Sequence, residues 1–212
     1  MELPKINFFN LTSSMSTLIF ATNNNNKILE IRSILNDDMQ IIGLREAGII
    51  TDIPEPHPTL EENAREKSNF IFKLTKSDCF SEDTGLEVMA LNGEPGVKSA
   101  RYAGDDSDNE KNIEKLLQKM TLVNDRTAQF RTVISLIVNG EEIQFEGICK
   151  GTITEIQRGN KGFGYDSIFI PEGSNKTFAE MEMSEKNKFS HRKKATSKLI
   201  DYLNNYYGKN QN

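Results

Sequence analysis

Two adjacent carboxylates end an apolar run in the segment CFSEDTGLEV, residues 79–88. Glu82 and Asp83 precede Thr84 and Gly85, a pair that we interpret as a tight turn between two strands. Side chains alternate along a strand, so only one of the two acids can face a given side. Carboxylates at strand ends often bind Mg²⁺, a hard cation that prefers oxygen ligands. The segment therefore predicts a magnesium site, with an ordinary acidic turn as the open alternative.

A run of four asparagines and a lysine lies between an apolar stretch and an amphipathic one. The pattern predicts a strand over 18–22 and a helix over 27–35. The first turn of a helix exposes free N–H groups and the positive end of the helix dipole, where anions bind readily. Thr22 adds a hydroxyl, Asn24 an amide and Lys27 a positive charge. We therefore predict a loop that holds phosphates, although a solvated, asparagine-rich turn would have the same composition. The loop is not a P-loop, because the GxxxxGK[ST] pattern is absent.

A glycine-rich segment, GFGYDSIF, starts at Gly162. Gly162 and Gly164 allow the backbone to come close to a flat or charged group. Phe163 lies between them and is suited to stacking on an aromatic ring. The alternative is an ordinary glycine loop that packs its aromatic side chain on the core.

Cations are concentrated near a predicted helix start in the segment EKNKFSHRKKA, residues 185–195. Positive charge in the first turn opposes the helix dipole, which favours acids there. A sequence that breaks a local rule often does so for function, and a bound polyanion would compensate for the unfavourable charge. The alternative is a basic, solvated helix.

Helices alternate with strands in the first half of the chain, and an antiparallel hairpin is predicted in the second half. The dipeptide Asn139-Gly140 supplies the positive φ angles of a two-residue hairpin turn between strands 130–138 and 141–148. The other predicted strands are 39–44, 79–83, 86–91, 152–156 and 167–170, and the other predicted helices are 59–74, 109–120 and 191–206. This pattern predicts an α/β fold with an elongated mixed sheet flanked by helices, in two lobes with a cleft between them. We expect a flexible extension over residues 1–16, one domain over 17–208, and a tail over 209–212.

Composition limits the possible functions. The net charge of −5 argues against a broad surface for nucleic acid or for an anionic membrane, because both need clustered cations. No apolar run approaches the ~18 residues of a membrane span. Cys79 and Cys149 lack metal-ligand spacing, so we expect reduced core cysteines of a cytoplasmic protein. The chain has two histidines, His57 and His191, which excludes a site of many histidines.

Taken together, the four segments resemble one family, the inosine triphosphate pyrophosphatases. These Ham1-type nucleoside triphosphate pyrophosphatases clear deaminated purine nucleotides. The resemblance extends from Leu18 to about Tyr206 and rests on ATNNNNK, EDTGLEVMALNGEPGVKSARYAG, GFGYDSIF and EKNKFSHR, in the family's order. The chain departs from the family pattern at four positions, where Asn23, Glu82, Thr84 and Ser167 replace a glycine, an aspartate, a serine and a proline.

The resemblance implies a role for each matching position. Asp83 is the implied catalytic proton acceptor and, with Glu55, the implied Mg²⁺ ligand. The implied substrate-binding residues are those of the phosphate loop (Thr22, Asn23, Asn24, Asn25, Asn26, Lys27), Thr84, those of the base-binding loop (Phe163, Gly164, Tyr165, Asp166), and Lys186, His191 and Arg192. A cytoplasmic homodimer is also implied.

The implied reaction is hydrolysis of ITP, dITP or XTP between the α and β phosphates. We expect Arg192 and His191 to donate hydrogen bonds to the 6-oxo group of the base, which adenine lacks. A Maf-type pyrophosphatase acting on other modified nucleotides and a nucleotide-binding sensor without hydrolysis are the alternatives. A nucleic-acid-binding module is disfavoured by the acidic balance. For any of the nucleotide readings, Lys27, Asp83 and Arg192 must meet in one cleft.

Overall fold

The computed structural model describes residues 16–35, 39–51 and 53–209. The predicted N-terminal extension lies outside this range except for Ser16, which begins the first strand, and the predicted tail lies outside it except for Lys209, which ends the last helix. The strands are β1 (Ser16–Phe20), β2 (Met39–Gly43), β3 (Cys79–Val88), β4 (Pro95–Gly96), β5 (Thr127–Val138), β6 (Glu141–Ile153) and β7 (Phe169–Pro171). The α-helices are α1 (Asn25–Arg32), α2 (Leu60–Thr75), α3 (Asn109–Lys119), α4 (Met183–Lys186) and α5 (His191–Lys209).

The strands form one seven-stranded sheet in the order β2-β1-β3-β5-β6-β7, with β4 paired to β3. β1 runs parallel to β2 and β3, and the remaining pairs are antiparallel. The predicted hairpin joins β5 and β6 through Asn139 (φ 49°) and Gly140 (φ 80°). The predicted mixed sheet is therefore confirmed.

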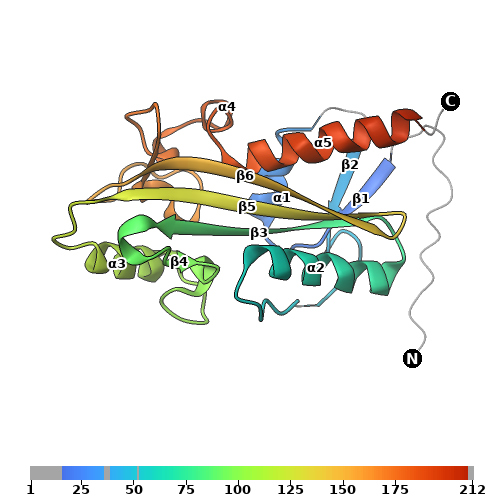
Figure 1. Cartoon of the computed structure of the whole chain (residues 1–212), viewed down its shortest axis with the longest axis horizontal. Coiled ribbons are helices and arrows are strands. Elements are labelled where there is room, and N and C mark those ends of the chain that lie inside the picture. Colours follow the sequence, from blue (N-terminus) through green and yellow to red (C-terminus); the bar gives the residue numbers. More distant parts are fainter. Residues whose placement is uncertain (1–15, 36–38, 52, 210–212) are drawn as a thin grey trace.

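Figure 1 shows that β3, β5 and β6 run nearly the length of the molecule, with α5 along one side of them and α2 along the other. α5 packs Ala195, Leu199 and Leu203 into an apolar cluster with Ile134 and Leu136 of β5. On the other face, α2 buries Leu60 and Ala64 against Val133. α3 lies at the end of the long strands away from α2, where its side chains belong to a separate apolar core. Residues of the long strands thus contribute to each of these apolar clusters, and the arrangement confirms the predicted elongated sheet flanked by helices.

The predicted turn at Thr84-Gly85 is wrong, because β3 continues through both residues and pairs with β5 along its whole length. Gly85 has a different task. A Cβ at this position would lie 2.5 Å from the carbonyl oxygen of Gly96, so glycine lets β4 cross directly over β3. Glu82 and Asp83 consequently lie in the middle of a strand, and the predicted strand 86–91 ends at Val88, before a 3₁₀ turn over Met89–Leu91.

Several predicted boundaries also shift. The predicted strands 141–148 and 152–156 are one strand, β6, which ends at Ile153. The predicted strand 167–170 is a 3₁₀ helix (Gly164–Ile168) followed by β7. Cys79 and Cys149 are free and buried, as expected. Within the described ranges, no helix has both the length and the apolar character that a membrane crossing needs.

Candidate active site

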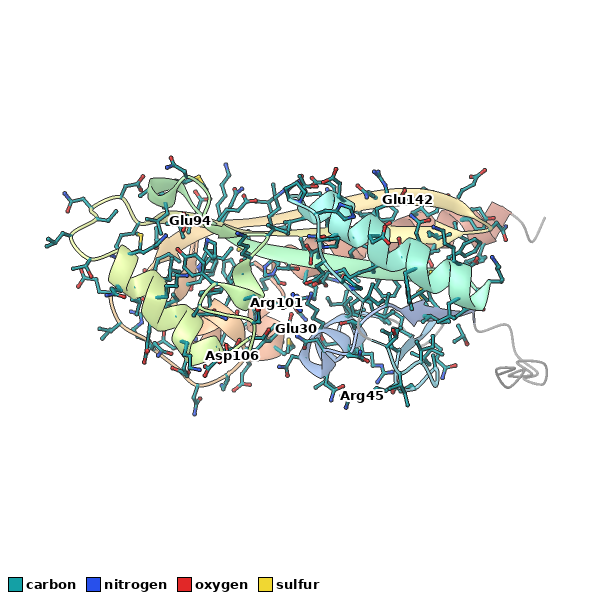
Figure 2. All side chains as sticks on the ribbon, turned by 90° about the horizontal axis from the view of Figure 1, so that it is seen from below. Glu30, Arg45, Glu94, Arg101, Asp106 and Glu142 are labelled. Carbon is teal, nitrogen blue, oxygen red and sulfur yellow. The ribbon has the colours of Figure 1, made fainter. Side chains whose placement is uncertain are left out.

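A cavity of about 270 Å³ lies between the two ends of the molecule and is lined from both. Asn24, Asn26 and Lys27 border it from the loop between β1 and α1. The opposite wall comes from the segment before β7 and from the start of α5. Lys27, Asp83 and Arg192 all face this cavity, so the predicted convergence is confirmed. In Figure 2, Glu30 and Arg101 mark its neighbourhood near the middle of the molecule.

The asparagine loop builds its own helix cap. Asn24 is the N-cap of α1, and its side-chain oxygen accepts hydrogen bonds from the backbone N–H groups of Asn26 (3.0 Å) and Lys27 (3.2 Å). Thr22 Oγ1 in turn accepts from Asn24 N at 3.1 Å. The expectation of free N–H groups is therefore wrong for these two positions, because an anion here would compete with the Asn24 side chain. The positive charge at the loop comes from Lys27, whose Nζ lies 3.3 Å from Glu82 Oε1.

Thirteen of the sixteen predicted site residues line the cavity. The remaining three, Thr22, Asn23 and Asn25, line a separate cavity of about 240 Å³ behind the loop. Asn23 donates from Nδ2 to the carbonyl oxygen of Thr51 at 3.1 Å. In this structure these residues support the loop from behind, and the direct contact with substrate that the resemblance implies for them stays a prediction.

Asp83 points to the α2 side of β3, where a buried lysine meets it. Lys67 Nζ lies 2.9 Å from Asp83 Oδ1 and 2.6 Å from Glu55 Oε1. It also donates to the carbonyl oxygen of Glu82 at 2.8 Å. Arg101 holds the other Glu55 oxygen at 3.1 Å. The two predicted metal acids, from segments 28 positions apart, are thus joined through one ammonium group.

The two acids differ in their proton affinity. Burial raises the pKa of Asp83, with the Glu55 charge adding to the effect, although Lys67 opposes both. Burial works in the same direction on Glu55, but Lys67, Lys27 and Arg101 together outweigh it and lower the pKa of Glu55 to about 2. Lys67 stays charged, because Asp83 and Glu55 raise its pKa despite its burial. Asp83 is therefore the better proton acceptor of the two, and Glu55 is a permanent carboxylate.

The acids also fit a divalent cation. Asp83 Oδ2 is a buried carboxylate oxygen without a hydrogen-bond partner among the described residues, which is the chemistry of an open ligand position. Over the same part of the chain, no three acidic, histidine or cysteine side chains converge as an all-protein metal site. Two carboxylates suit Mg²⁺, which keeps several waters and is usually completed by substrate phosphates.

Glu82 points to the opposite face of β3, as alternation requires, and belongs to a buried charge network. Arg192 binds it with two parallel hydrogen bonds, Nε to Oε2 and Nη2 to Oε1, both at 2.7 Å. Arg192 Nη1 also donates to Glu30, and Lys186 Nζ lies 2.6 Å from both Glu30 and Asp166. The expectation that a bound polyanion offsets the cations near α5 is thus wrong for Lys186 and Arg192, because carboxylates of the protein do so.

The side wall of the cavity is aromatic. The His191 ring stacks on Phe130 with 4.6 Å between centroids, and Phe163 lies 5.6 Å from both the Arg192 guanidinium and Lys186 Nζ. Burial and the charges of Arg192 and Lys186 lower the pKa of His191 well below its usual value, so the ring is neutral. A neutral imidazole carries one donor and one acceptor. His191 Nδ1 has no partner within the described chain, so the ring has hydrogen-bonding capacity to spare.

The loop before β7 completes this wall. Asp166 accepts from the backbone N–H of Phe163 at 3.0 Å, and Tyr165 donates its hydroxyl to the carbonyl oxygen of Ser99 at 2.9 Å. Gly164 has φ 59°, so the turn favours a residue without Cβ. Thr84 donates to Glu82 Oε1 at 2.8 Å. The bonds of Asp166 and Tyr165 hold the predicted base-binding loop in place.

Sequence reasoning missed Lys67, Glu30, Arg101 and Phe130. The first two carried a readable signal, because each is a charged residue on the apolar side of an amphipathic helix. Lys67 lies between Ala64 and Ile71 on α2, and Glu30 lies beside Ile31 on α1. A charge in such a position needs a buried partner. Arg101 and Phe130 carried no local signal that separates them from surface and core residues.

The mixed sheet, the cation-lined cavity and the paired acids define an α/β enzyme that acts on a phosphorylated ligand. The sequence profile of the Ham1 family matches residues 18–202, and the chain belongs to this family. The alternative of a Maf-type pyrophosphatase is therefore wrong for this chain. A dITP/XTP pyrophosphatase of Flavobacterium psychrophilum is 50% identical over 188 residues, which are 89% of this chain and 99% of that protein. One of Porphyromonas gingivalis is 50% identical over 190 residues, 89% and 98% of the two chains.

Solved structures agree with this assignment. The Ham1 protein of Staphylococcus aureus superposes with a TM-score of 0.81 at 40% identity, covering 90% of this chain and all of that one. The HAM1 protein of Coxiella burnetii gives a TM-score of 0.82 at 34% identity, with the same coverage.

Proposed function

We propose that this chain is a nucleoside triphosphate pyrophosphohydrolase that converts dITP, ITP and XTP to the monophosphate and pyrophosphate. The observation that carries the proposal is the meeting of Lys27, Asp83 and Arg192 in one cavity of a Ham1-family fold. The names of the relatives, dITP/XTP pyrophosphatase, support the substrate class. A sensor without hydrolysis is disfavoured, because both candidate metal acids are present and connected.

The hydrolytic step needs a water oxygen to bond to the α-phosphorus while the bond to the bridging oxygen of the β-phosphate breaks. Asp83 accepts the proton of that water, a role that suits its buried carboxylate and unpartnered Oδ2. Lys27 faces the triphosphate and offsets the negative charge that develops on the leaving pyrophosphate. Lys67 keeps the Asp83 carboxylate in place through Oδ1.

Glu55 and Asp83 are the residues that would hold Mg²⁺. When bound, the ion supplies charge neutralisation on the phosphates and favours deprotonation of the attacking water. A carboxylate that stays charged, Glu55, and one with an unsatisfied oxygen, Asp83, meet its requirement for oxygen ligands.

The base is read at the other end of the cavity. Arg192 has five N–H donors, and three of them bind Glu82 and Glu30, which leaves two for the 6-oxo group of a deaminated purine. Adenine presents an amino group there, so buried donors would stay unpaired at a cost of ~1–3 kcal/mol each. Phe163 and the Phe130–His191 stack provide apolar surface for the ring.

The decisive measurement is pyrophosphate release from ITP, dITP, XTP, GTP and ATP, with and without Mg²⁺. We expect release from ITP, dITP and XTP and none from ATP, and only with the divalent ion present, while GTP, which also has a 6-oxo group, tests whether the 2-position is recognised as well. Asp83→Asn should lower kcat at least 100-fold, since general-base catalysis contributes roughly 10²–10⁴-fold. Full turnover in this variant would refute the assignment of Asp83.

Arg192→Lys tests the reading of the base. Lysine keeps a cation between Glu82 and Glu30 but removes the planar fork of donors. We expect the ratio of kcat/KM for ITP over ATP to fall at least tenfold. An unchanged ratio would show that other groups recognise the 6-oxo position. The proposal also includes a cytoplasmic homodimer. Sedimentation measurements of mass in solution by analytical ultracentrifugation will test the dimer.

A further inference from the structure

Lys67 occupies the point between the two candidate metal acids. An ammonium group has three N–H donors, and here all three have acceptors: Glu55, Asp83 and the carbonyl oxygen of Glu82, at 2.6 to 2.9 Å. The side chain is only 6% exposed. Lys67 belongs to the buried side of α2.

The acids therefore already face cations. Arg101 binds Glu55 from the outer side, and Lys27 borders the same cavity. Glu82 adds no free negative charge, because Arg192 binds both of its oxygens. A divalent ion that approaches Asp83 Oδ2 meets Lys67 on the other oxygen of the same carboxylate. Two positive charges on the two oxygens of one carboxylate repel each other strongly even when the effective dielectric constant is high.

We propose that Lys67 makes the binding of the divalent ion conditional on the nucleotide. This inference rests on the proposed function. The protein alone binds the ion weakly, because Lys67 and Arg101 together offset the charges of the two acids and Lys67 repels the ion. The triphosphate brings several negative charges and further oxygen ligands to the same place, so the ion binds tightly once the nucleotide is present. Linkage requires the reverse as well: the ion must tighten nucleotide binding by the same factor.

The test is a titration of Mn²⁺, followed by electron paramagnetic resonance of the free ion. We compare the wild-type chain, Lys67→Met, and the matched control Lys73→Met, an exposed lysine on the same helix. Each is titrated alone and with a saturating, non-hydrolysable α,β-imido analogue of ITP, and the Mn²⁺ that the analogue binds without protein is measured separately and subtracted. Glu55→Gln with Asp83→Asn shows whether the observed Mn²⁺ is bound at this site.

For the wild-type chain and the Lys73→Met control, we expect the analogue to tighten Mn²⁺ binding at least tenfold. Lys67→Met alone should bind Mn²⁺ at least tenfold more tightly than the wild-type chain, with a smaller gain from the analogue. Equal or weaker Mn²⁺ binding by Lys67→Met would overturn the proposal and make Lys67 a residue that only positions the acids. Circular dichroism of each variant confirms the fold.

Two further results keep the proposal testable if Lys67→Met does not fold. Tight Mn²⁺ binding by the wild-type chain without the analogue would overturn it. Arg101→Met removes a partly exposed cation from Glu55 and should tighten Mn²⁺ binding about two- to fivefold. The proposed function fails separately, if no pyrophosphate is released from ITP.

Discussion

At the scale of single residues, the site is a set of buried charges that neutralise one another before any substrate enters. Arg192 is 2% exposed and binds two glutamates, and Lys186 is 4% exposed and binds a glutamate and an aspartate. Removing one partner of such a set leaves a buried charge unpaired, which typically costs ~3–5 kcal/mol. The network therefore fixes the positions of the groups that face the cavity, so substitutions that keep the charge are the informative ones.

His191 gives a pH prediction at this scale. Its pKa is lowered in the folded state, so below pH ~6.5 the unfolded chain binds a proton that the folded chain does not. The free energy of unfolding should thus fall with decreasing pH, by at most about 1.4 kcal/mol per pH unit for this one group. Urea unfolding measured between pH 7 and pH 5 gives the free energy of unfolding at each pH. Its change with pH should be smaller for His191→Gln than for the wild-type chain. His57→Gln, at a side chain 38% exposed, is the matched control variant.

At the scale of elements, the start of α5 lies almost in contact with the backbone of β6 (Figure 1). Gly147 makes this possible, since a Cβ there would lie 2.1 Å from the carbonyl oxygen of His191 and 2.5 Å from Ala195 N. Such distances do not occur in packed proteins, so any side chain at this position must push the helix away. The helix start carries His191 and Arg192, and the packing of one strand glycine therefore positions both.

Gly147→Ala tests this packing. We expect the free energy of unfolding to fall by ~1–3 kcal/mol, as for other overpacked sites, and kcat/KM for ITP to fall with it. Lys150→Ala, at an exposed position of the same strand, should change neither quantity appreciably. Urea unfolding and the pyrophosphate assay provide the two readouts. Wild-type stability in Gly147→Ala would mean that α5 is free to shift on the sheet.

At the scale of the whole molecule, local patterns predicted the elements, while contacts between distant segments decided the site. The Asn139-Gly140 turn was predictable because its φ angles depend on two adjacent residues. Gly85 was misread as a turn because its purpose, the close approach of Gly96, depends on a segment outside its own strand. The pairing of Glu30 with Arg192 joins positions 162 residues apart, and no spacing rule reports it. Resemblance to a family supplied the convergence that periodicity could not.

The cavity is lined from both ends of the chain, so the part of a ligand that is bound should decide which segments are protected from hydrogen exchange. In the proposed binding mode, the phosphate groups lie at Lys27 and the start of α1, and the base lies at the segment 163–166 and the start of α5, all of which line the cavity. Pyrophosphate with Mg²⁺ should therefore slow hydrogen exchange in residues 22–28 and leave 163–168 unchanged. The α,β-imido analogue of ITP should protect both segments together.

At 100 times the dissociation constant, a ligand stabilises the state that binds it by ~2.7 kcal/mol, so amides that exchange only through local openings that release the ligand should exchange roughly 100-fold more slowly. Hydrogen exchange measured by mass spectrometry on peptides that cover residues 22–28 and 163–168 distinguishes protection of one segment from protection of both. The hairpin turn around residues 139–140, remote from the cavity, is the internal control. Equal protection of both segments by pyrophosphate alone would contradict the division into a phosphate end and a base end, because pyrophosphate has no base to reach the second segment.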